Sequence, residues 1–174
     1  KAGKARYIGA SSMYAWQFAK AQRVAPTPFV SMQNHYNLIY REEELEMVPQ
    51  CLDMRVGLLP WSPLARGTLA RTSGDGPTTR AGTDPFRESL YRPELDEPVL
   101  DRLREVAAER AVPPAQIALA WLLHKPGVTA PIVGATKVEH VEDALAAEAL
   151  SLSDDEIRRL EEPYVPHPIS GIAL

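Results

Sequence analysis

Apolar and polar positions along this chain follow two different periods. Short apolar runs of strand length occupy residues 7–10, 29–33, 56–59 and 129–133. Between and after these runs, apolar residues recur every three or four positions, as on one face of a helix. This spacing predicts helices at residues 14–23, 42–51, 98–110, 113–124, 136–148 and 153–162. Strands that alternate with helices predict an α/β fold with a parallel sheet of four strands and helices outside it.

Several of the predicted helices begin with recognisable capping residues. Thr136 and Ser153 each precede a glutamate by three positions, which is the pattern of a capping box. Ser11 and Ser12 lie between the first strand and the first helix, where a hydroxyl commonly caps the helix. A ligand contact is the alternative role for these two serines.

A long polar stretch follows the third predicted strand. Residues 68–97 are rich in Gly, Pro, Thr, Asp and Arg. Loops of this length inside a compact domain are uncommon and are often lids or disordered segments. We therefore expect a long, mobile loop over residues 68–97.

Each predicted strand ends in a polar or glycine-containing turn. These turns are Ser11-Ser12, Gln33-Asn34, Trp61-Ser62 and residues 134–136. In parallel α/β folds the carboxyl ends of the strands collect on one face, where ligands bind. Trp61 by itself is equally compatible with a tryptophan packed in the core, but four converging turns favour a ligand site.

The composition narrows the function classes. The 174 residues are 45% apolar and 24% charged, as in a soluble globular domain. A formal net charge of −4 without a basic block argues against binding to nucleic acid. With Cys51 as the single cysteine, no intrachain disulfide can form, and a cytoplasmic location is expected. No apolar run approaches the ~20 residues of a membrane span, and no signal peptide is recognisable.

Neither a metal site nor a reactive thiol is predicted. Cys51 lies on a short helix without a basic cluster nearby, which indicates a buried, inert thiol. His124 lies at a helix end, where a surface histidine is expected. No spacing of His, Cys, Asp and Glu suits a metal ion.

Four motifs give the chain a family resemblance. They are GKARYIGASSM (3–13), QNHYNL (33–38), LLPWSPLARG (58–67) and PIVGAT (131–136). In this order and spacing they resemble the C-terminal half of the aldo-keto reductases. The resemblance is closest to the branch with Trp-Ser-Pro-Leu after the seventh barrel strand, which includes the potassium-channel β subunits. It implies parallel (β/α) units of a TIM barrel, and with four strand candidates the chain would supply about half of the ~250 residues of a barrel.

The resemblance also implies a cofactor, NADP(H), extended across the C-terminal face of the barrel. Ser11, Ser12 and Gln33 match positions that contact the nicotinamide carboxamide, and Trp61 matches the aromatic residue that stacks on the nicotinamide ring. The pyrophosphate would run along Ser62, Pro63, Leu64, Ala65, Arg66 and Gly67. The adenosine end would lie at Gly134, Thr136, His140 and Asp143.

The chain departs from the family pattern at several of these positions. Position 12 is more often Asn, His140 stands where Gln or Arg is usual, and Asp143 stands where Glu is usual. Arg71 and Arg87, in the long polar stretch, are expected partners of the 2′-phosphate, because a guanidinium binds phosphate in bidentate fashion.

The catalytic residues of the family are an Asp, a Tyr, a Lys and a His from the first half of the barrel, and none is matched here. The first hypothesis is that the chain is the cofactor-binding half of an NADP(H)-dependent reductase of aldehydes and ketones, inactive by itself. The alternative is a non-catalytic half-barrel that binds NADP(H) or pairs with another chain. Expected partners are a small carbonyl substrate and either the missing N-terminal half or another chain, since a half-barrel exposes apolar strand edges.

Overall fold

The structure is a computed structural model, which describes residues 3–72 and 85–172. Its strands are β1 (Ile8–Ser11), β2 (Phe29–Gln33) and β3 (Gly57–Leu58). Its α-helices are α1 (Ala15–Val24), α2 (Met47–Asp53), α3 (Pro85–Leu90), α4 (Pro93–Arg110), α5 (Pro114–His124), α6 (Val138–Glu148) and α7 (Asp154–Glu161). Two 3₁₀ segments, η1 (Glu42–Glu44) and η2 (Ala65–Ala70), complete the described elements.

The sheet is parallel, in the order β1-β2-β3. The expected fourth strand is reduced to two isolated parallel bridges, in which Val128 pairs with Leu58 and Ile132 pairs with Trp61. The prediction of a full strand at residues 129–133 was therefore wrong, although its place beside β3 was right. Pro60 and Pro131 contribute to this difference, because neither has an N–H to donate to a ladder.

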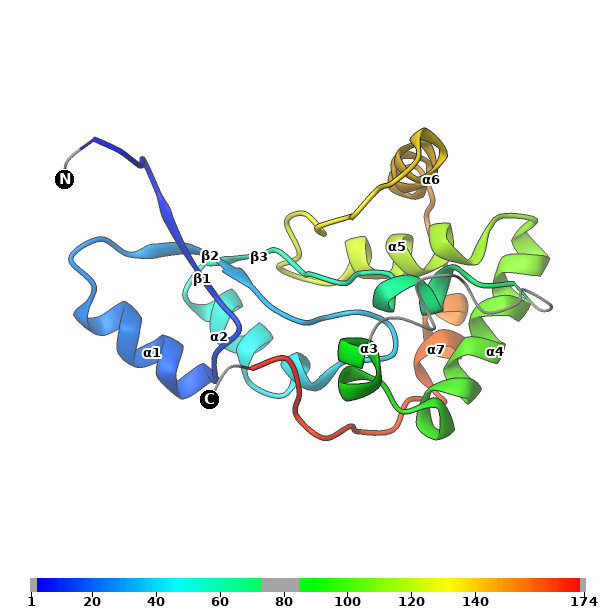
Figure 1. The fold of residues 1–174 in the computed structure, drawn as a ribbon, viewed down its shortest axis with the longest axis horizontal. Coiled ribbons are helices and arrows are strands. Elements are labelled where there is room, and N and C mark those ends of the chain that lie inside the picture. Colours follow the sequence, from blue (N-terminus) through cyan, green and yellow to red (C-terminus); the bar gives the residue numbers. More distant parts are fainter. Residues whose placement is uncertain (1–2, 73–84, 173–174) are drawn as a thin grey trace.

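Helices cover the sheet unevenly. In Figure 1, α1 and α2 lie beside the strands, whereas α4, α5 and α7 form a cluster at the opposite end and α6 stands apart from it. The core runs from Phe18 and Met32 through Leu58 to Leu103 and Trp121, all buried. After α7 the chain returns across the molecule towards the strands (Figure 1). None of the described helices is long and apolar enough to cross a membrane.

Of the predicted helix caps, the one at Ser153 is confirmed and the others are wrong. Ser153 caps α7, accepting the Glu156 N–H at 3.3 Å while Glu156 accepts the Ser153 N–H at 2.7 Å. Thr136 does not cap α6, which begins after Lys137 without a side-chain cap. Ser11 and Ser12 do not cap α1 either, since the N-cap position is Tyr14. The two serines are left to bond elsewhere.

The expectation of an irregular stretch over residues 68–97 was wrong for most of its described part. Thr68 belongs to η2, α3 occupies Pro85–Leu90, and α4 begins at Pro93, five residues before the predicted start. A proline fits the first turn of a helix because its missing N–H has no partner there. Pro98, the predicted first residue of this helix, lies inside α4. Residues 73–84 lie outside the described part of the chain.

Candidate functional site

The turns that follow the strands meet at one place. The backbone oxygen of Gln33 accepts bonds from the Ser12 N–H and the Ser11 hydroxyl, both at 3.0 Å. The Trp61 N–H donates to the Asn34 oxygen at 2.9 Å. The Ile132 N–H donates to the Pro60 oxygen at 2.8 Å. The predicted convergence is confirmed for the first three strand ends, and Ile132 brings the segment before residues 134–136 beside the third.

Trp61 lies at the centre of this region and is half-buried. Its indole Nε1–H donates to the Ser12 hydroxyl at 3.1 Å, so the side chains of two predicted cofactor contacts are directly joined. One face of the indole stacks on His35, with ring centroids 4.4 Å apart and planes 11° apart. Phe86 of α3 also stacks with the indole, at a centroid distance of 6.4 Å. Trp61 therefore packs against the core while keeping part of its surface exposed.

His35 is the middle ring of a stack formed by Tyr40, His35 and Trp61. Its centroid lies 4.1 Å from that of Tyr40. Burial, with a smaller contribution from His167, lowers the pKa of His35 to about 3, so the imidazole is neutral at physiological pH. His35 belongs to the QNHYNL motif that follows β2, and the structure buries it beneath Trp61.

A buried hydrogen-bond network fixes the turn after Trp61. Tyr91 Oη lies 2.9 Å from His35 Nε2, and Asn37 Nδ2 donates to Tyr91 Oη at 3.2 Å and to the Ser62 oxygen at 3.0 Å. No motif or spacing in the sequence points to Tyr91, which lies in the stretch expected to be irregular. Burial raises the pKa of Tyr91 above its usual range. A general acid needs the opposite shift, so this tyrosine serves structure.

The backbone of the site is locally strained. Among residues 3–72 and 85–172, six non-glycine residues have positive φ, and Ser12, Ser62, Ala65 and Arg66 are four of them. Gly67 follows with a φ of 94°, and a Cβ there would meet open space. Left-handed conformations cost L-residues free energy and cluster at ligand sites. All four positions were predicted as cofactor contacts from the sequence. In the same turn, Pro63 and Ala65 are buried and Leu64 packs against the core.

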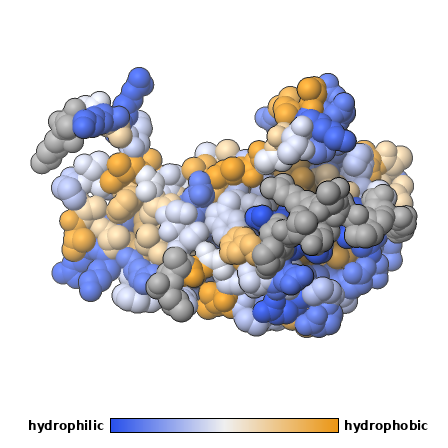
Figure 2. Space-filling view, viewed as in Figure 1, coloured by the Kyte–Doolittle hydropathy of each residue, from blue (hydrophilic) through white to orange (hydrophobic). Residues whose placement is uncertain are grey.

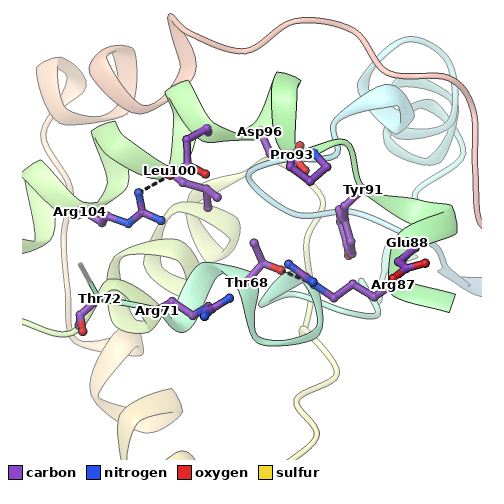
Figure 3. Close-up of a pocket in the computed structure, with 11 residues that line it drawn as sticks. Thr68, Arg71, Thr72, Arg87, Glu88, Tyr91, Pro93, Asp96, Leu100 and Arg104 are labelled. Atoms are coloured by element: carbon purple, nitrogen blue, oxygen red, sulfur yellow. Dashed lines mark hydrogen bonds and ion pairs between the residues drawn. The ribbon is translucent and has the colours of Figure 1, made fainter. Parts of the chain in front are cut away.

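Arg71 and Arg87 line one pocket of about 520 Å³ between η2, α3 and α4 (Figure 3). Arg87 Nε donates to the Thr68 hydroxyl at 3.1 Å. Arg104 joins them from α4 and is paired with Glu97 at 2.7 Å and with Asp101 at 2.8 Å. Arg66 lies outside this pocket, with its guanidinium 5.4 Å from the centre of the Phe86 ring. The pocket thus brings together the two arginines proposed for one phosphate.

The third predicted group lies at the start of α6. Gly134, Thr136 and His140 are exposed, and His140 Nδ1 lies 3.5 Å from the Thr136 N–H. Asp143 instead accepts a bond from Gln116 of α5 at 2.9 Å. Its carboxylate is therefore engaged between two helices, whereas the other three residues present an open surface.

A tyrosine and a lysine do approach one carboxylate, but away from the strand ends. The Tyr36 hydroxyl donates to Glu44 Oε1 at 2.6 Å, and Lys125 Nζ lies 3.1 Å from the same oxygen. Burial and the charge of Glu44 raise the pKa of Tyr36 above its usual range, which again is the reverse of what a general acid requires. No group of three or more His, Cys, Asp or Glu residues in the described part of the chain could hold a metal ion.

The chain matches known proteins over nearly its whole length. The family model described as "Aldo/keto reductase family" matches residues 1–164. The versiconal hemiacetal acetate reductase of Aspergillus parasiticus is 47% identical over 97% of this chain and 51% of its own length. A putative aryl-alcohol dehydrogenase of Schizosaccharomyces pombe is 48% identical over 98% of this chain and 50% of its own length.

A solved structure shows the same fold. The crystal structure of a thermostable aldo-keto reductase in complex with the inhibitor epalrestat has a TM-score of 0.67 and 29% sequence identity. It covers 91% of this chain, which in turn covers 48% of that chain. The chain spans about half the length of the curated relatives it matches, and its parallel β/α units are a partial TIM barrel. It belongs to the aldo/keto reductase family.

Proposed function

We propose that this chain carries the NADP(H)-binding site of an oxidoreductase that reduces aldehydes or ketones to alcohols. The observation that carries the proposal is the cluster of left-handed residues Ser12, Ser62, Ala65 and Arg66 around the half-exposed indole of Trp61. A fold keeps strained backbone where a ligand needs close approach. NADP(H), when bound, supplies the hydride, and the residues of this chain bind and orient it.

Trp61, Ser12 and Gln33 would hold the nicotinamide end. An indole offers a broad apolar face for a planar ring, and Trp61 is fixed in position by His35 beneath it and by its bond to Ser12. Hydroxyl and amide side chains suit a carboxamide, which both donates and accepts hydrogen bonds. Ser11 and Gln33 lie at the same strand ends.

Arg71 and Arg87 would select the phosphorylated cofactor. The pocket that they share has the size to admit a phosphate, and Thr68 adds a hydroxyl to its lining. Arg66 and the backbone of residues 62–67 would approach the pyrophosphate. The open surface at Gly134, Thr136 and His140 would receive the adenosine, with Asp143 at its edge.

The substrate is proposed to be a small carbonyl compound. This class is suggested by the printed names of the relatives, a hemiacetal acetate reductase and a putative aryl-alcohol dehydrogenase.

Exposed apolar side chains support a role for a further set of β/α units. On α6, Val138, Val141 and Leu145 form an exposed stripe, visible as apolar surface on that helix in Figure 2. Beside β1, Tyr7 and Trp16 are also exposed. In a closed barrel such faces are covered by neighbouring units. We propose an N-terminal half-barrel or another chain as the partner.

A non-catalytic role is the alternative. It is favoured by two buried tyrosines, because burial raises the pKa of Tyr36 and of Tyr91 and neither suits proton donation. In that case the chain would bind NADP(H), or pair with another chain, without reducing a carbonyl.

The test is a titration of the 174-residue chain with NADPH and with NADH. NADPH is expected to bind more tightly, and Arg71→Gln with Arg87→Gln should bring the two affinities together by weakening NADPH alone. The matched control is Arg158→Gln, an exposed arginine on α7, which should change neither. Equal affinities in the wild type would contradict the 2′-phosphate assignment, and failure to bind either dinucleotide would contradict the proposed function.

A further inference from the structure

The last described residues lie against the candidate site. They follow residue 164, where the match to the family ends. Ser170 forms two bonds with the Tyr40 hydroxyl, which accepts the Ser170 N–H at 3.0 Å and lies 3.2 Å from the Ser170 oxygen. Tyr40 is the outer ring of the stack that supports Trp61. Residues 165–172, called the strap below, are therefore attached directly to that stack.

Gly171 brings the strap against Trp61 itself. Its φ is +74°, and a Cβ at this position would lie 2.9 and 3.0 Å from Cζ2 and Cη2 of the indole and 3.3 Å from His35 Cβ. Only glycine can approach so closely in this conformation. The strap thus closes over the edge of both the indole and the imidazole.

His167 anchors the strap to α4 through hydrogen bonds at both ring nitrogens. Its Nε2 lies 2.9 Å from Asp96 Oδ1 and its Nδ1 lies 2.9 Å from the Val165 oxygen, so both ring nitrogens face acceptors. Both side chains of the His167–Asp96 pair are 2% exposed. Only an imidazolium, with a proton on each nitrogen, satisfies both acceptors at once. A neutral imidazole carries a single N–H, so its other nitrogen would turn a lone pair towards an oxygen at hydrogen-bond distance.

The other groups around His167 are accounted for. Tyr164 stacks on the imidazole, and Tyr40 meets it edge-on. Glu42 accepts the His167 N–H and the Tyr164 hydroxyl, both at 2.8 Å. Burial raises the pKa of both tyrosines, so they stay protonated where an imidazole titrates. Asp96 Oδ2 is held by the Arg92 N–H at 2.9 Å, which leaves Oδ1 for His167.

We propose that the strap is a positioning element for Trp61, held closed while both ring nitrogens of His167 donate and loosened when one of those two protons is lost. The consequence for cofactor affinity rests on the proposed function, whereas the movement of the strap does not. With both protons present, Ser170 and Gly171 hold the ring stack. On loss of either proton, a ring nitrogen and an acceptor oxygen repel each other, the strap opens, and Trp61 loses the contact at its edge.

The test measures amide protection of residues 165–172 by hydrogen exchange at pH 6 and pH 9, corrected for intrinsic exchange. In the wild type, protection of the Ser170 amide should fall by about tenfold or more at pH 9. The indole N–H resonance of Trp61, assigned with Trp61→Phe, should shift over the same range. NADPH affinity should fall several-fold in parallel.

Asp96→Asn provides the decisive variant. An asparagine can donate to neutral His167 through Nδ2 and accept the Arg92 N–H through Oδ1, so the strap should stay closed at both pH values. His167→Ala should open it at both. His124→Ala, at an exposed histidine on α5, should keep the wild-type profile.

The possible outcomes separate the two proposals. Equal protection of Ser170 at pH 6 and pH 9 in the wild type would overturn the strap proposal, as would a wild-type pH profile in Asp96→Asn. Should His167→Ala fail to fold, Asp96→Asn and the wild type still decide. If the strap responds as expected but NADPH does not bind at either pH, the proposed function fails and the strap stands.

Discussion

At the scale of the residue, Trp61 has the clearest consequence for binding. Trp61→Ala removes the face on which the nicotinamide is proposed to stack, and should weaken NADPH binding by roughly 1–3 kcal/mol through lost burial and stacking. Fluorescence or calorimetric titration would measure the change. Trp16→Ala is the matched control, because Trp16 is an exposed tryptophan on α1. Unchanged affinity in Trp61→Ala would remove the ring from the proposed site.

Glu43 gives a prediction about stability and pH. Burial raises the pKa of the Glu43 carboxyl from its ordinary value of 4.5 to about 7. Between these pH values the folded chain keeps a proton that the unfolded chain has lost, so stability falls as pH rises from about 4.5 to about 7. Glu43→Gln removes this cost and should stabilise the fold at pH 8 by about 2–3 kcal/mol, with little effect at pH 4.

Urea unfolding at the two pH values would measure the effect of Glu43→Gln. Glu46→Gln, at an exposed neighbour, serves as the control and should leave the pH profile unchanged. A loss of stability in Glu43→Gln at pH 8 would show that the buried carboxylate is held by interactions stronger than its desolvation.

Sequence reasoning at this scale succeeded where one residue type had one physical role. Cys51 was predicted to be buried and inert; it is fully buried, and its pKa is raised to about 12. The burial of His35 was not predicted, because a strand end in the sequence does not reveal which side chain turns inward. Contacts between distant segments, such as Gly171 with Trp61, leave no local pattern to read.

At the scale of the element, the two capping-box patterns offer a matched pair. Ser153→Ala removes the cap of α7 and should cost about 1 kcal/mol of stability. Thr136→Ala, in the same sequence pattern, should cost almost nothing because Thr136 caps no helix. Thermal or urea unfolding of both variants would compare them. Equal losses would mean that Thr136 stabilises the chain in some way other than capping α6.

The elements were predicted well where burial imposes a period. β2 runs from Phe29 to Gln33 as expected, and α5 and α7 start within one residue of their predicted positions. α3 was missed because its six residues are too few to show a helical repeat. The segment from Val128 to Ile132 has the sequence pattern of a strand but forms isolated bridges. An apolar run in the sequence does not show how many hydrogen bonds its backbone makes to a neighbouring strand.

At the scale of the whole molecule, the parallel order of the strands and the convergence of their ends followed from the alternation of strands and helices. Side-chain directions did not follow from it. Asp143 was placed with the adenosine end, yet its carboxylate is bonded to Gln116 of α5. Arg71 and Arg87 were expected to bind one phosphate, and they do line the same pocket. The assignment of that pocket to the 2′-phosphate stays a prediction.

The chain by itself is expected to lack reductase activity. The 174-residue chain alone should oxidise NADPH near background with a reactive aromatic aldehyde, even with the cofactor bound. Within residues 3–72 and 85–172, burial raises the pKa of the tyrosines that approach a histidine or a lysine, away from that of a useful acid; they are Tyr36, Tyr40, Tyr91 and Tyr164. A positioned general acid contributes ~10²–10⁴-fold, and oxyanion-stabilising donors contribute a further ~10²–10³-fold.

Supplying an N-terminal half-barrel that carries the Asp, Tyr, Lys and His of the family should restore turnover. Its units would cover α6 and the side of β1 while placing those residues above Trp61. The assay is the decay of NADPH absorbance for the chain alone, for the reconstituted pair, and for a pair in which Leu145→Asp disrupts the exposed face of α6. Activity in the first sample would show that an acid within these 174 residues had been misassigned. Equal activity of the reconstituted pair and of the pair with Leu145→Asp would show that α6 does not form the interface between the halves.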